Sequence, residues 1–514
     1  MADESTPLLY QRNDSDSSFT EPSLSQSLLP ENKHQHLPSL NSTVEKCIGQ
    51  FTWSQFLQAV LVSFAWVFDA QQTFISVFTD AQPSQNCTIT NQKASIISEW
   101  NLDQENSFIT GLPTSLFFLG CLAGGILLAT LADSSFGRKN MLFFSCLFMS
   151  LSSLLAAFSI NIWMYSVIKF LCGFARATIG TSALVLTSEL VGNRWRGQIS
   201  VVGFFCFTIG FLSLPAIAYA NINSSWRNLY LYTSIPSILY CFIVKFFVRE
   251  SPRWLLVKGR KEEAAETLKC IASITQSNVN LAINGMMTSS SRNNSDLSLT
   301  TANTDLYSAM KILLQKKWSS RRLSMVMASG FGIGMVYYGM PLGLGNLSFN
   351  LYLSVAFNAL SELPSSLITF VLIDKFNRRT ALLAFAVVSG IFSVLSTMEG
   401  EVWSQIQIIM ELISFFCACT AFNVYMIFTT ELFPTCVRNS ALAMARQALV
   451  LGGSISPLLV GEGRKNKFVC YGVFGLVICC SGVFGVFLPE TRGRPLSDTM
   501  EEEEDKGSDA AILP

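Results

Sequence analysis

Two stretches of this 514-residue chain decide its fold: LADSSFGRKN at residues 131–140 and LIDKFNRRT at residues 372–380. Each stretch closes a long apolar run, and each places an acidic residue a few positions before two basic residues. The acidic residues are Asp133 and Asp374, and the basic pairs are Arg138 with Lys139 and Arg378 with Arg379. This pattern, an acid followed by two basic residues, is called here the charged device. Its occurrence at matching places in two parts of the chain indicates an internal duplication.

The composition is typical of a membrane protein. Apolar residues make up 50% of the chain and charged residues only 14%, whereas a soluble domain carries about a quarter charged residues. Apolar runs of about 20 residues predict membrane-spanning helices. Twelve such runs occur, at residues 53–79, 108–132, 141–160, 163–187, 198–220, 229–248, 323–341, 348–373, 380–397, 403–429, 440–461 and 467–488. The predicted fold class is an all-α membrane protein with twelve transmembrane helices.

Basic residues mark one side of the predicted membrane. They gather in every second loop, and such loops are expected to be cytosolic. These residues include Arg138, Lys139, Arg194, Arg196, Arg249, Lys261, Arg378, Arg379 and Arg438. Both chain ends then lie in the cytosol. One cluster is an exception, because Arg464, Lys465 and Lys467 fall in a loop on the opposite side.

A polar segment divides the twelve runs into two sets of six. We predict a disordered cytosolic tail, a six-helix bundle, a cytosolic linker with short helices, a second six-helix bundle and an acidic cytosolic tail. These parts cover residues 1–50, 51–248, 249–322, 323–488 and 489–514. The charged device follows the second run of each set, as a duplicated six-helix unit requires.

This arrangement resembles the major facilitator superfamily, whose members carry an acid, a glycine and paired basic residues after the second and eighth spans. The resemblance implies two bundles related by a pseudo-two-fold axis, with charge clamps that join neighbouring helix ends on the cytosolic face. The implied clamp residues are Asp133, Arg138, Lys139, Glu189, Arg196, Asp374, Arg378, Arg379, Glu431 and Arg438. The simpler interpretation of the basic pairs is a plain positive-inside anchor.

Both copies of the device depart from the family pattern. Three residues separate Asp133 from Gly137, where two are usual, and Asn377 stands where a glycine is usual. Asparagine tolerates a positive φ better than most residues do. We therefore expect Asn377 to supply the backbone conformation of the missing glycine.

Further motifs indicate the branch of the superfamily. ELVGNRWRG at residues 189–197 is echoed by ELFPTCVRNSALA at 431–443, and RESPRWLLVKGR at 249–260 is echoed by LPETRGRPL at 488–496. Sugar porters share this set with organic cation/carnitine transporters. The segments MVYYGMPLG (335–343) and 346–379, together with ELFPTCVRN, resemble the organic cation/carnitine transporters, and the short first outer loop resembles their plant-type branch. A sugar porter carries a glutamine pair and an asparagine in span seven, where this chain has tyrosines.

Ionisable residues inside membrane spans are costly and mark candidate sites. The candidates are Asp69, Lys169, Arg176, Glu362, Glu411 and Arg446. The resemblance places a cavity carboxylate at Glu362, which is the first candidate for attracting a cation. The ring faces of Tyr337 and Tyr338 suit a quaternary ammonium group. We expect one of the two tyrosines to face the cavity and the other to pack against lipid or a helix.

Arg446 is the candidate group for a carboxylate, because arginine binds carboxylates through two hydrogen bonds. Acids in spans ten and eleven of animal relatives are matched here by Asn423 and Val450, which favours a ligand that is not strictly cationic. Asp69 either couples a proton or pairs with Arg176. The predicted substrate-binding set is Glu362, Tyr337, Tyr338, Arg446, Asp69, Asn423 and Arg176. The competing interpretation is that the charged members pair with one another in a structural role.

The predicted function is secondary active or facilitative transport of organic cations or zwitterions such as carnitine, or of polyamines, by alternating access. A proton-coupled sugar or polyol symporter and a non-transporting membrane sensor or scaffold are the alternatives. An enzyme is not expected, because both histidines lie in the polar head and no nucleophile and base occur together. The expected partners are the lipid bilayer, a small organic ligand and a proton or sodium ion. No cofactor, bound metal or nucleic acid is expected, and the chain is expected to be a monomer.

Two short signals concern the location of the protein. ESTPLL at residues 4–9 resembles a cytosolic sorting signal for vacuolar or lysosomal membranes, which favours the vacuolar membrane over the plasma membrane. The sequon Asn86-Cys87-Thr88 lies in the first outer loop and predicts glycosylation at Asn86.

Overall fold

The computed structural model describes most of the apolar chain. The described residues are 48, 51–81, 95–102, 105–128, 136–192, 195–271, 306–347, 349–372, 375–398, 403–434, 436–492, 497 and 499–504. This part of the chain is helical, with no strand within it. Eleven of its helical spans are long and apolar enough to cross a membrane.

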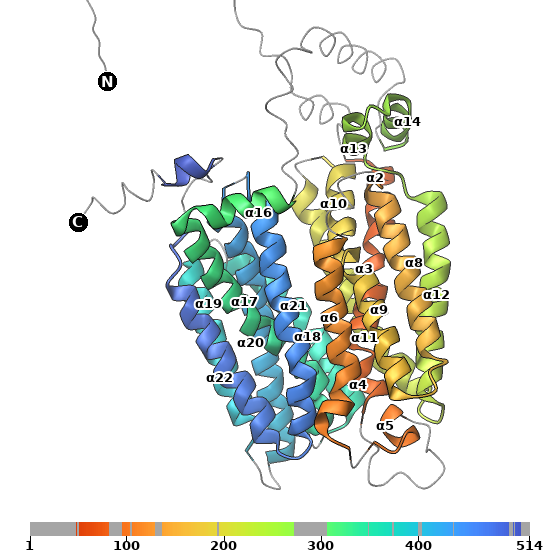
Figure 1. Ribbon diagram of the computed structural model, residues 1–514, viewed down its shortest axis with the longest axis vertical. Helices are drawn as coiled ribbons and strands as arrows, with labels where there is room; N and C mark the ends of the chain where they lie inside the picture. The colour runs from red at the N-terminus through yellow and green to blue at the C-terminus, as the bar shows by residue number, and fades with distance from the viewer. Residues whose placement is uncertain are drawn as a thin grey trace, which may run out of the picture. The chain divides into compact units, whose positions relative to one another are not determined.

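The first half of the chain forms six of the expected spans (Figure 1). The first span is broken into three consecutive helices, α2 (Trp53–Ser63), α3 (Ala65–Phe74) and α4 (Ser76–Thr79), and the fourth span is broken into α9 (Ile162–Arg176) and α10 (Ile179–Leu190). The other spans are α6 (Ser107–Leu127), α8 (Arg138–Ala156), α11 (Arg196–Ala220) and α12 (Trp226–Phe247), and the short helix α5 (Ile96–Glu99) precedes α6.

The second half forms six long helices. They are α17 (Lys317–Gly343), which ends in the 3-10 turn η3 (Leu344–Asn346), α18 (Leu351–Leu372), α19 (Arg378–Leu395), α20 (Trp403–Leu432), α21 (Arg438–Gly463) and α22 (Lys467–Val486). With 22 residues, α18 completes the set of six, although it is not one of the eleven candidate spans.

Both halves pair their helices in the same way. In the first half the first span packs on the fifth (α3 on α11), the second on the fourth (α6 on α9) and the third on the sixth (α8 on α12). The second half repeats these pairs as α17 on α21, α18 on α20 and α19 on α22. The halves meet through α6 against α21 and α11 against α18, which again exchange second and fifth spans. The duplication that the charged device indicated is therefore present in the packing.

Glycines bring the paired helices close together. A Cβ atom on Gly210 of α11 would lie 2.2 Å from the carbonyl oxygen of Val67 in α3. At the corresponding place in the second half, a Cβ atom on Gly452 of α21 would lie 1.9 Å from the carbonyl oxygen of Phe331 in α17. Small residues allow this approach, which supplies the van der Waals contact that holds helices together in lipid.

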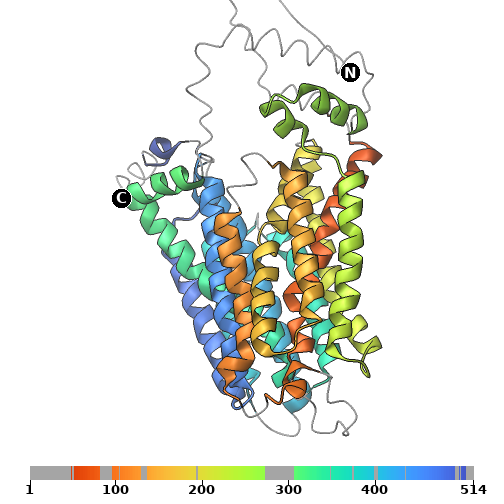
Figure 2. The same cartoon turned by 45° about the vertical axis from the view of Figure 1, so that its right-hand side comes forward.

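Short helices cover the side of the protein that carries the basic loops, called here the basic side. The linker forms α13 (Pro252–Val257), α14 (Lys261–Ile271) and α16 (Leu306–Gln315), and Figure 2 shows α13 and α14 beyond the ends of the first-half helices. The hydroxyls of Thr52 and Ser54 donate to the carbonyl oxygens of Ile271 (2.9 Å) and Cys270 (2.7 Å). The linker helix α14 is thereby attached to the start of α2.

An acidic residue caps the third helix of each half on the basic side. In the first half, Glu250 Oε1 accepts hydrogen bonds from the backbone N–H groups of Arg138 and Lys139, each at 3.0 Å. In the second half, Glu490 accepts from the backbone N–H groups of Arg378 (3.0 Å) and Arg379 (3.2 Å). In both cases the acid follows the capped arginine by 112 residues. A carboxylate in this place satisfies unpaired N–H groups and complements the positive end of the helix dipole.

The arginine of each basic pair also contacts the acid at the end of the fourth or tenth span. Arg378 makes a two-point contact with Glu431, with both nitrogen–oxygen distances at 3.1 Å. In the first half, Arg138 Nε lies 3.7 Å from Glu189 Oε2, so this pair is looser. Four of the predicted clamp residues thus meet in two matching pairs.

The remaining clamp predictions have mixed outcomes. Asp133 and Asp374 lie outside the described residues, as does the predicted glycosylation site Asn86. Arg196 and Arg438 begin the matching helices α11 and α21, and Arg438 Nε donates to the carbonyl oxygen of Phe433 at 3.3 Å.

The expectation for Asn377 was wrong. Gly137 has φ of 83° before α8, but Asn377 has φ of −65° and ψ of 136° before α19. A Cβ atom on Gly137 would lie 2.4 Å from Glu250 Oε2. In the first half, position 137 therefore needs glycine for two reasons: its φ is positive, and a side chain there would collide with Glu250. In the second half, Asn377 has an extended backbone, and Glu490 still caps the helix.

Glu490 generates a prediction about pH. Burial alone would raise the pKa of this carboxyl, but the backbone N–H groups of Arg492, Arg378, Arg379 and Thr491 donate to it and bring its pKa below the ordinary value. A group with a lowered folded-state pKa stabilises the fold above its unfolded pKa, and that stabilisation is lost as the pH falls through the folded-state pKa. Replacement Glu490→Gln should therefore destabilise the protein by about 1 kcal/mol at neutral pH.

Thermal unfolding of the detergent-solubilised protein measures this effect. The difference in midpoint between wild type and Glu490→Gln should shrink as the pH is lowered into the acid range. Glu501→Gln, at an exposed residue of the tail, is the matched control and should behave as wild type. A difference that is independent of pH would contradict a role for the charge of Glu490.

Candidate functional site

A buried ion pair joins the first and fourth spans. Arg176 Nη2 donates to Asp69 Oδ2 at 2.9 Å, and Arg176 Nε lies 2.8 Å from Asp69 Oδ1. Arg176 therefore contacts both carboxylate oxygens, one through a hydrogen bond and the other through close charge contact. Asp69 is only 3% exposed. Of the two interpretations left open for Asp69, its pairing with Arg176 is present in the structure.

An aromatic and acidic cluster lies between α17, α18 and α20. Tyr337 donates its hydroxyl to Glu362 Oε1 at 2.7 Å, and its ring stacks on Phe422 at a centroid distance of 4.5 Å. Phe415 lies parallel to the same ring at 6.2 Å. The other oxygen of Glu362, Oε2, is buried and has no hydrogen-bond partner among the described residues. Glu362 is thus directed into the protein, where Oε2 keeps one acceptor for a ligand.

Tyr338 connects this cluster with the first half. Its ring lies 4.9 Å from the ring of Phe118 in α6 and 5.0 Å from that of Tyr337. A Cβ atom on Gly453 of α21 would meet Tyr338 Cδ2 at 2.8 Å, so this glycine makes room for the ring. The expectation that one tyrosine packs against a helix is met by Tyr338. Both tyrosines, however, belong to one aromatic row that runs from α6 to α20.

Arg446 stands beside this row on α21. It interacts electrostatically with Asp69 and Tyr338, yet the described residues place no carboxylate within 4.0 Å of it. Its side chain is half-buried. Asn423, which follows Phe422 on α20, turns its amide towards Ser366 Oγ of α18 at 3.4 Å.

The predicted binding residues therefore meet where the two halves join. Asp69 and Arg176 come from the first half, and the other five come from the second half. Two contributors were missed from the sequence, Phe118 and Phe415. Phe415 lies seven residues before Phe422, and this spacing places both on one face of a helix. That periodicity was the available signal, but it does not distinguish a ligand site from ordinary packing.

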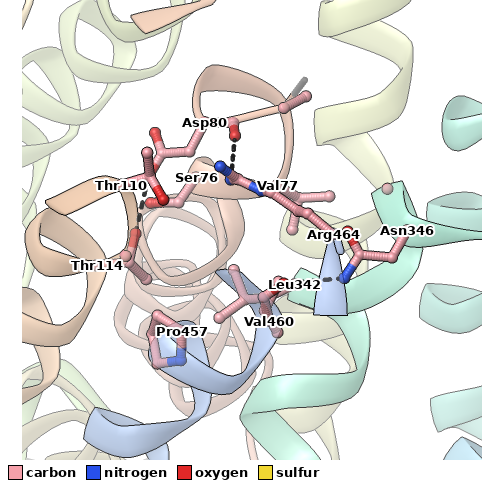
Figure 3. A pocket seen from close by; sticks show the side chains of 13 residues that line it. Ser76, Val77, Asp80, Thr110, Thr114, Leu342, Asn346, Pro457, Val460 and Arg464 are labelled. Carbon is pink, nitrogen blue, oxygen red and sulfur yellow. Dashed lines mark hydrogen bonds between the residues drawn. The ribbon is translucent and has the colours of Figure 1, made fainter. Parts of the chain in front are cut away.

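The opposite side of the protein is joined across the halves. Figure 3 shows Arg464, at the end of α21, reaching the carbonyl oxygen of Asp80 at the end of α4; the Nη2 to oxygen distance is 3.0 Å. The Asp80 carboxylate accepts from Thr114 at 2.9 Å and Thr79 at 2.7 Å. Nearby, a Cβ atom on Gly111 would lie 2.8 Å from the carbonyl oxygen of Pro457. Arg464, an exception to the charge rule in the sequence, thus has a structural contact here.

The contacts on the basic side differ from this arrangement. The ion pairs with two described partners on that side, including Arg138 with Glu189 and Arg378 with Glu431, each join groups of the same half. The outer ends are thus joined across the halves, whereas these ion pairs on the basic side stay within one half.

Comparison with known proteins agrees with this architecture. The family model described as "Sugar (and other) transporter" matches residues 56–502. Organic cation/carnitine transporter 3 of Arabidopsis thaliana is 55% identical, with 98% of each chain covered. Human organic anion transporter 3 is 29% identical over 80% of this chain and 74% of its own length.

Solved structures show the same fold. The inward-open structure of the xylose transporter XylE from E. coli superposes with a TM-score of 0.62 at 19% identity, covering 88% of this chain and 98% of the other. This similarity confirms the predicted twelve-helix fold with its two bundles. The prediction that the chain is not an enzyme is confirmed by its relatives, which are transporters. The chain belongs to the organic cation/carnitine transporters of the major facilitator superfamily and is a multi-pass membrane protein.

Proposed function

We propose that this protein carries organic cations and zwitterions such as carnitine across its membrane by alternating access. The observation that carries the proposal is the junction of the two halves. A carboxylate with an unused acceptor, a row of aromatic rings and an arginine lie together there, and within the described part of the chain the arginine has no acidic partner at ion-pair distance. Two relatives from Arabidopsis thaliana, at 55% and 54% identity, are named organic cation/carnitine transporters, which points to the same ligand class. Polyamines are a second cationic class that the same carboxylate would attract.

The cationic end of a ligand fits the side of the site formed by Glu362 and Tyr337. A quaternary ammonium group has no N–H donor, so it is bound by charge and by aromatic faces rather than by hydrogen bonds. Glu362 supplies the charge, and Phe422 supplies a ring face. The ring of Tyr337 lies between Phe415 and Phe422, so Tyr337 contributes through its hydroxyl and its edge. Each ring face is worth about 2 kcal/mol when the cation is desolvated.

The anionic end of a zwitterion fits Arg446. This arginine is half-buried beside Tyr338 and lacks a carboxylate within ion-pair distance among the described residues. Arg176 is less suited to this task, since both of its contacts with Asp69 are already made. Arg446 is thus the better partner for a carboxylate, and Glu362 and Arg446 together select ligands with opposite charges at two ends.

Alternating access would use the contacts at the two membrane faces. In the proposed cycle, the matching pairs Arg138–Glu189 and Arg378–Glu431 hold each half together while the halves rock. The bond from Arg464 to Asp80 would break when the opposite side opens. The coupling ion is proposed to be a proton or sodium, and Asp69 is one candidate for the proton.

The vacuolar membrane is the proposed location, with Asn86 glycosylated on the side opposite the basic loops. The sorting motif at residues 4–9 and Asn86 both lie outside the described residues, so these proposals rest on sequence motifs alone. A fluorescently tagged chain should label the vacuolar membrane, and a version with Leu8→Ala and Leu9→Ala should move to the plasma membrane. Plasma-membrane labelling of the unchanged chain would contradict the proposed location.

Uptake assays test the transport proposal directly. In yeast that expresses the protein, labelled carnitine or tetraethylammonium should accumulate with saturable kinetics, while labelled hexose should not exceed the background of the empty strain. Saturable hexose uptake without cation or carnitine uptake would support a sugar carrier instead. Uptake into cells can be measured only if the protein is in the plasma membrane. The version with Leu8→Ala and Leu9→Ala is therefore used for this assay.

Substitutions at the two ends of the site should affect the uptake of different ligands. Glu362→Gln should lower tetraethylammonium uptake about tenfold, because a lost charged contact is worth at least about 1.4 kcal/mol. Arg446→Ala should lower carnitine uptake about tenfold and leave tetraethylammonium uptake within about twofold of wild type. Protein abundance at the membrane, measured by immunoblot, corrects each rate.

Arg446→Lys serves as the matched control for the arginine. It keeps the positive charge but loses the two-point geometry, so carnitine uptake should recover only in part. Equal losses of both ligands in both mutants would contradict a site with two separate ends.

A further inference from the structure

A second buried carboxylate lies in the second half, outside the proposed binding set. Glu411 of α20 is 0% exposed. Its Oε2 accepts a hydrogen bond from Asn358 Nδ2 of α18 at 3.0 Å. The described residues place no lysine or arginine within 4.0 Å of Glu411. It therefore differs from Asp69, whose charge is matched by Arg176.

In the part of the chain that the structure describes, three polar atoms around Glu411 have no hydrogen-bond partner. They are Glu411 Oε1, Asn358 Oδ1 and the hydroxyl of Tyr471 on α22, and all three side chains are 0% exposed. Tyr471 is close enough to interact electrostatically with Glu411. Buried polar groups normally have partners, so three such atoms in one cluster point to a site whose hydrogen bonding depends on its protonation.

A proton on Glu411 removes the main cost of burying this group. Burying an unpaired carboxylate costs several kcal/mol, even after the protein relaxes around it. A proton on Oε1 removes the charge and turns an acceptor into a donor, which the oxygen of a neighbouring group such as Asn358 can accept, while the Tyr471 hydroxyl can both donate and accept. Exchanging the amide atoms of Asn358 gives the same result, because its oxygen would then face Glu411 Oε2, which requires a hydrogen between them. The donation from Asn358 Nδ2 to Ser354 O at 3.1 Å supports the orientation shown.

This cluster is connected to the proposed ligand site by two routes. Asn358 lies four residues before Glu362 on α18, so the two side chains share one face of the helix. Phe415 lies four residues after Glu411 on α20, and its ring stacks on Tyr337 at 6.2 Å. Loss or gain of a proton at Glu411 would therefore change the positions of Asn358 and Phe415, and through them the surroundings of Glu362 and Tyr337.

The titratable and charged groups around Glu411 favour a neutral site. The helices that pack against α20 are α17, α18, α19 and α21. They present Tyr337, Glu362, the pair Arg378 and Arg379, and Arg446, and α20 itself and α22 add Cys419, Cys470 and Tyr471. The arginines of α19 contact Glu431 and Glu490 on the basic side, and Arg446 interacts with Asp69 and Tyr338. No cation among the described residues compensates Glu411.

We propose that Glu411 is a proton-binding site of the second half, held by Asn358, and that its proton moves with the transport cycle. The coupling ion is then a proton, and its site lies next to the cationic end of the ligand pocket. This inference rests on the proposed transport function, and the experiment below separates the two.

The test uses the full-length protein in proteoliposomes. Two flux measurements are made on wild type, Glu411→Gln and the control Glu462→Gln, an exposed residue at the end of α21. Counterflow of labelled carnitine at equal pH reports ligand exchange alone. Accumulation driven by a gradient of one pH unit reports coupling, and at one proton per carnitine it reaches about tenfold, equivalent to about 1.4 kcal/mol.

Glu411→Gln should keep counterflow within about twofold of wild type and lose the accumulation driven by the pH gradient. The control should match wild type in both assays. Infrared spectroscopy of the same samples gives a readout independent of transport: wild type should show the C=O band of a protonated carboxyl, and Glu411→Gln should lack it. Asn358→Leu keeps the carboxyl but removes its partner, so this band should shift to higher wavenumber.

Three results would overturn the proposal: undiminished accumulation by Glu411→Gln, a carboxyl band unchanged by that substitution, or wild-type accumulation that follows a sodium gradient and ignores pH. Absence of counterflow for every cation and zwitterion in wild type would instead count against the proposed function. In that case the infrared band still decides whether Glu411 holds a proton.

Discussion

The cost of placing charge in a medium of low dielectric constant governs the interior of this protein. Each ionisable group within the spans must find an opposite charge, a hydrogen-bond donor or a proton. Arg176 provides the opposite charge for Asp69, and Tyr337 provides a hydrogen-bond donor for Glu362. Arg446 has no acidic partner within 4.0 Å among the described residues. The interior is therefore unevenly neutralised, with the unmatched positive charge close to the row of aromatic rings.

The same constraint accounts for the matching ends of the two halves. Helix ends on the basic side leave N–H groups without intrahelical partners, and Glu250 and Glu490 accept from them in equivalent positions. The acid that caps one helix belongs to the chain just after the sixth or twelfth span. Each cap therefore ties the start of the third helix of a half to the end of its sixth, which are also packed together as α8 on α12 and α19 on α22.

The features that could be predicted from the sequence are those that leave a periodic or repeated pattern in it. Hydropathy located the spans, and the family resemblance placed Arg138, Glu189, Arg378 and Glu431 among the clamp residues without saying which of them pair. The roles of Glu250 and Glu490 were missed although both stand in repeated motifs, since a side chain that binds backbone N–H groups 112 residues away leaves no local signal. The error at Asn377 arose because a glycine was assumed to answer a backbone requirement alone. The pairing of Asp69 with Arg176 could be named but not chosen from sequence, because it depends on how α3 and α9 pack.

The aromatic row gives the site a property that neither half has alone. Phe118 belongs to the first half and Tyr338 to the second, so their contact at 4.9 Å must change whenever the halves rock. The contacts of Tyr337 with Glu362 and Phe422 lie within the second half and are not required to change. In the proposed cycle the cationic end of the ligand would stay with the second half, while Tyr338 and its neighbour Arg446 would sense the position of the first half through Phe118 and Asp69. Ligand binding and helix rearrangement would then be coupled through the anionic end, because Arg446 of α21 interacts with Asp69 of the first half, whereas Glu362 of α18 bonds within the second half.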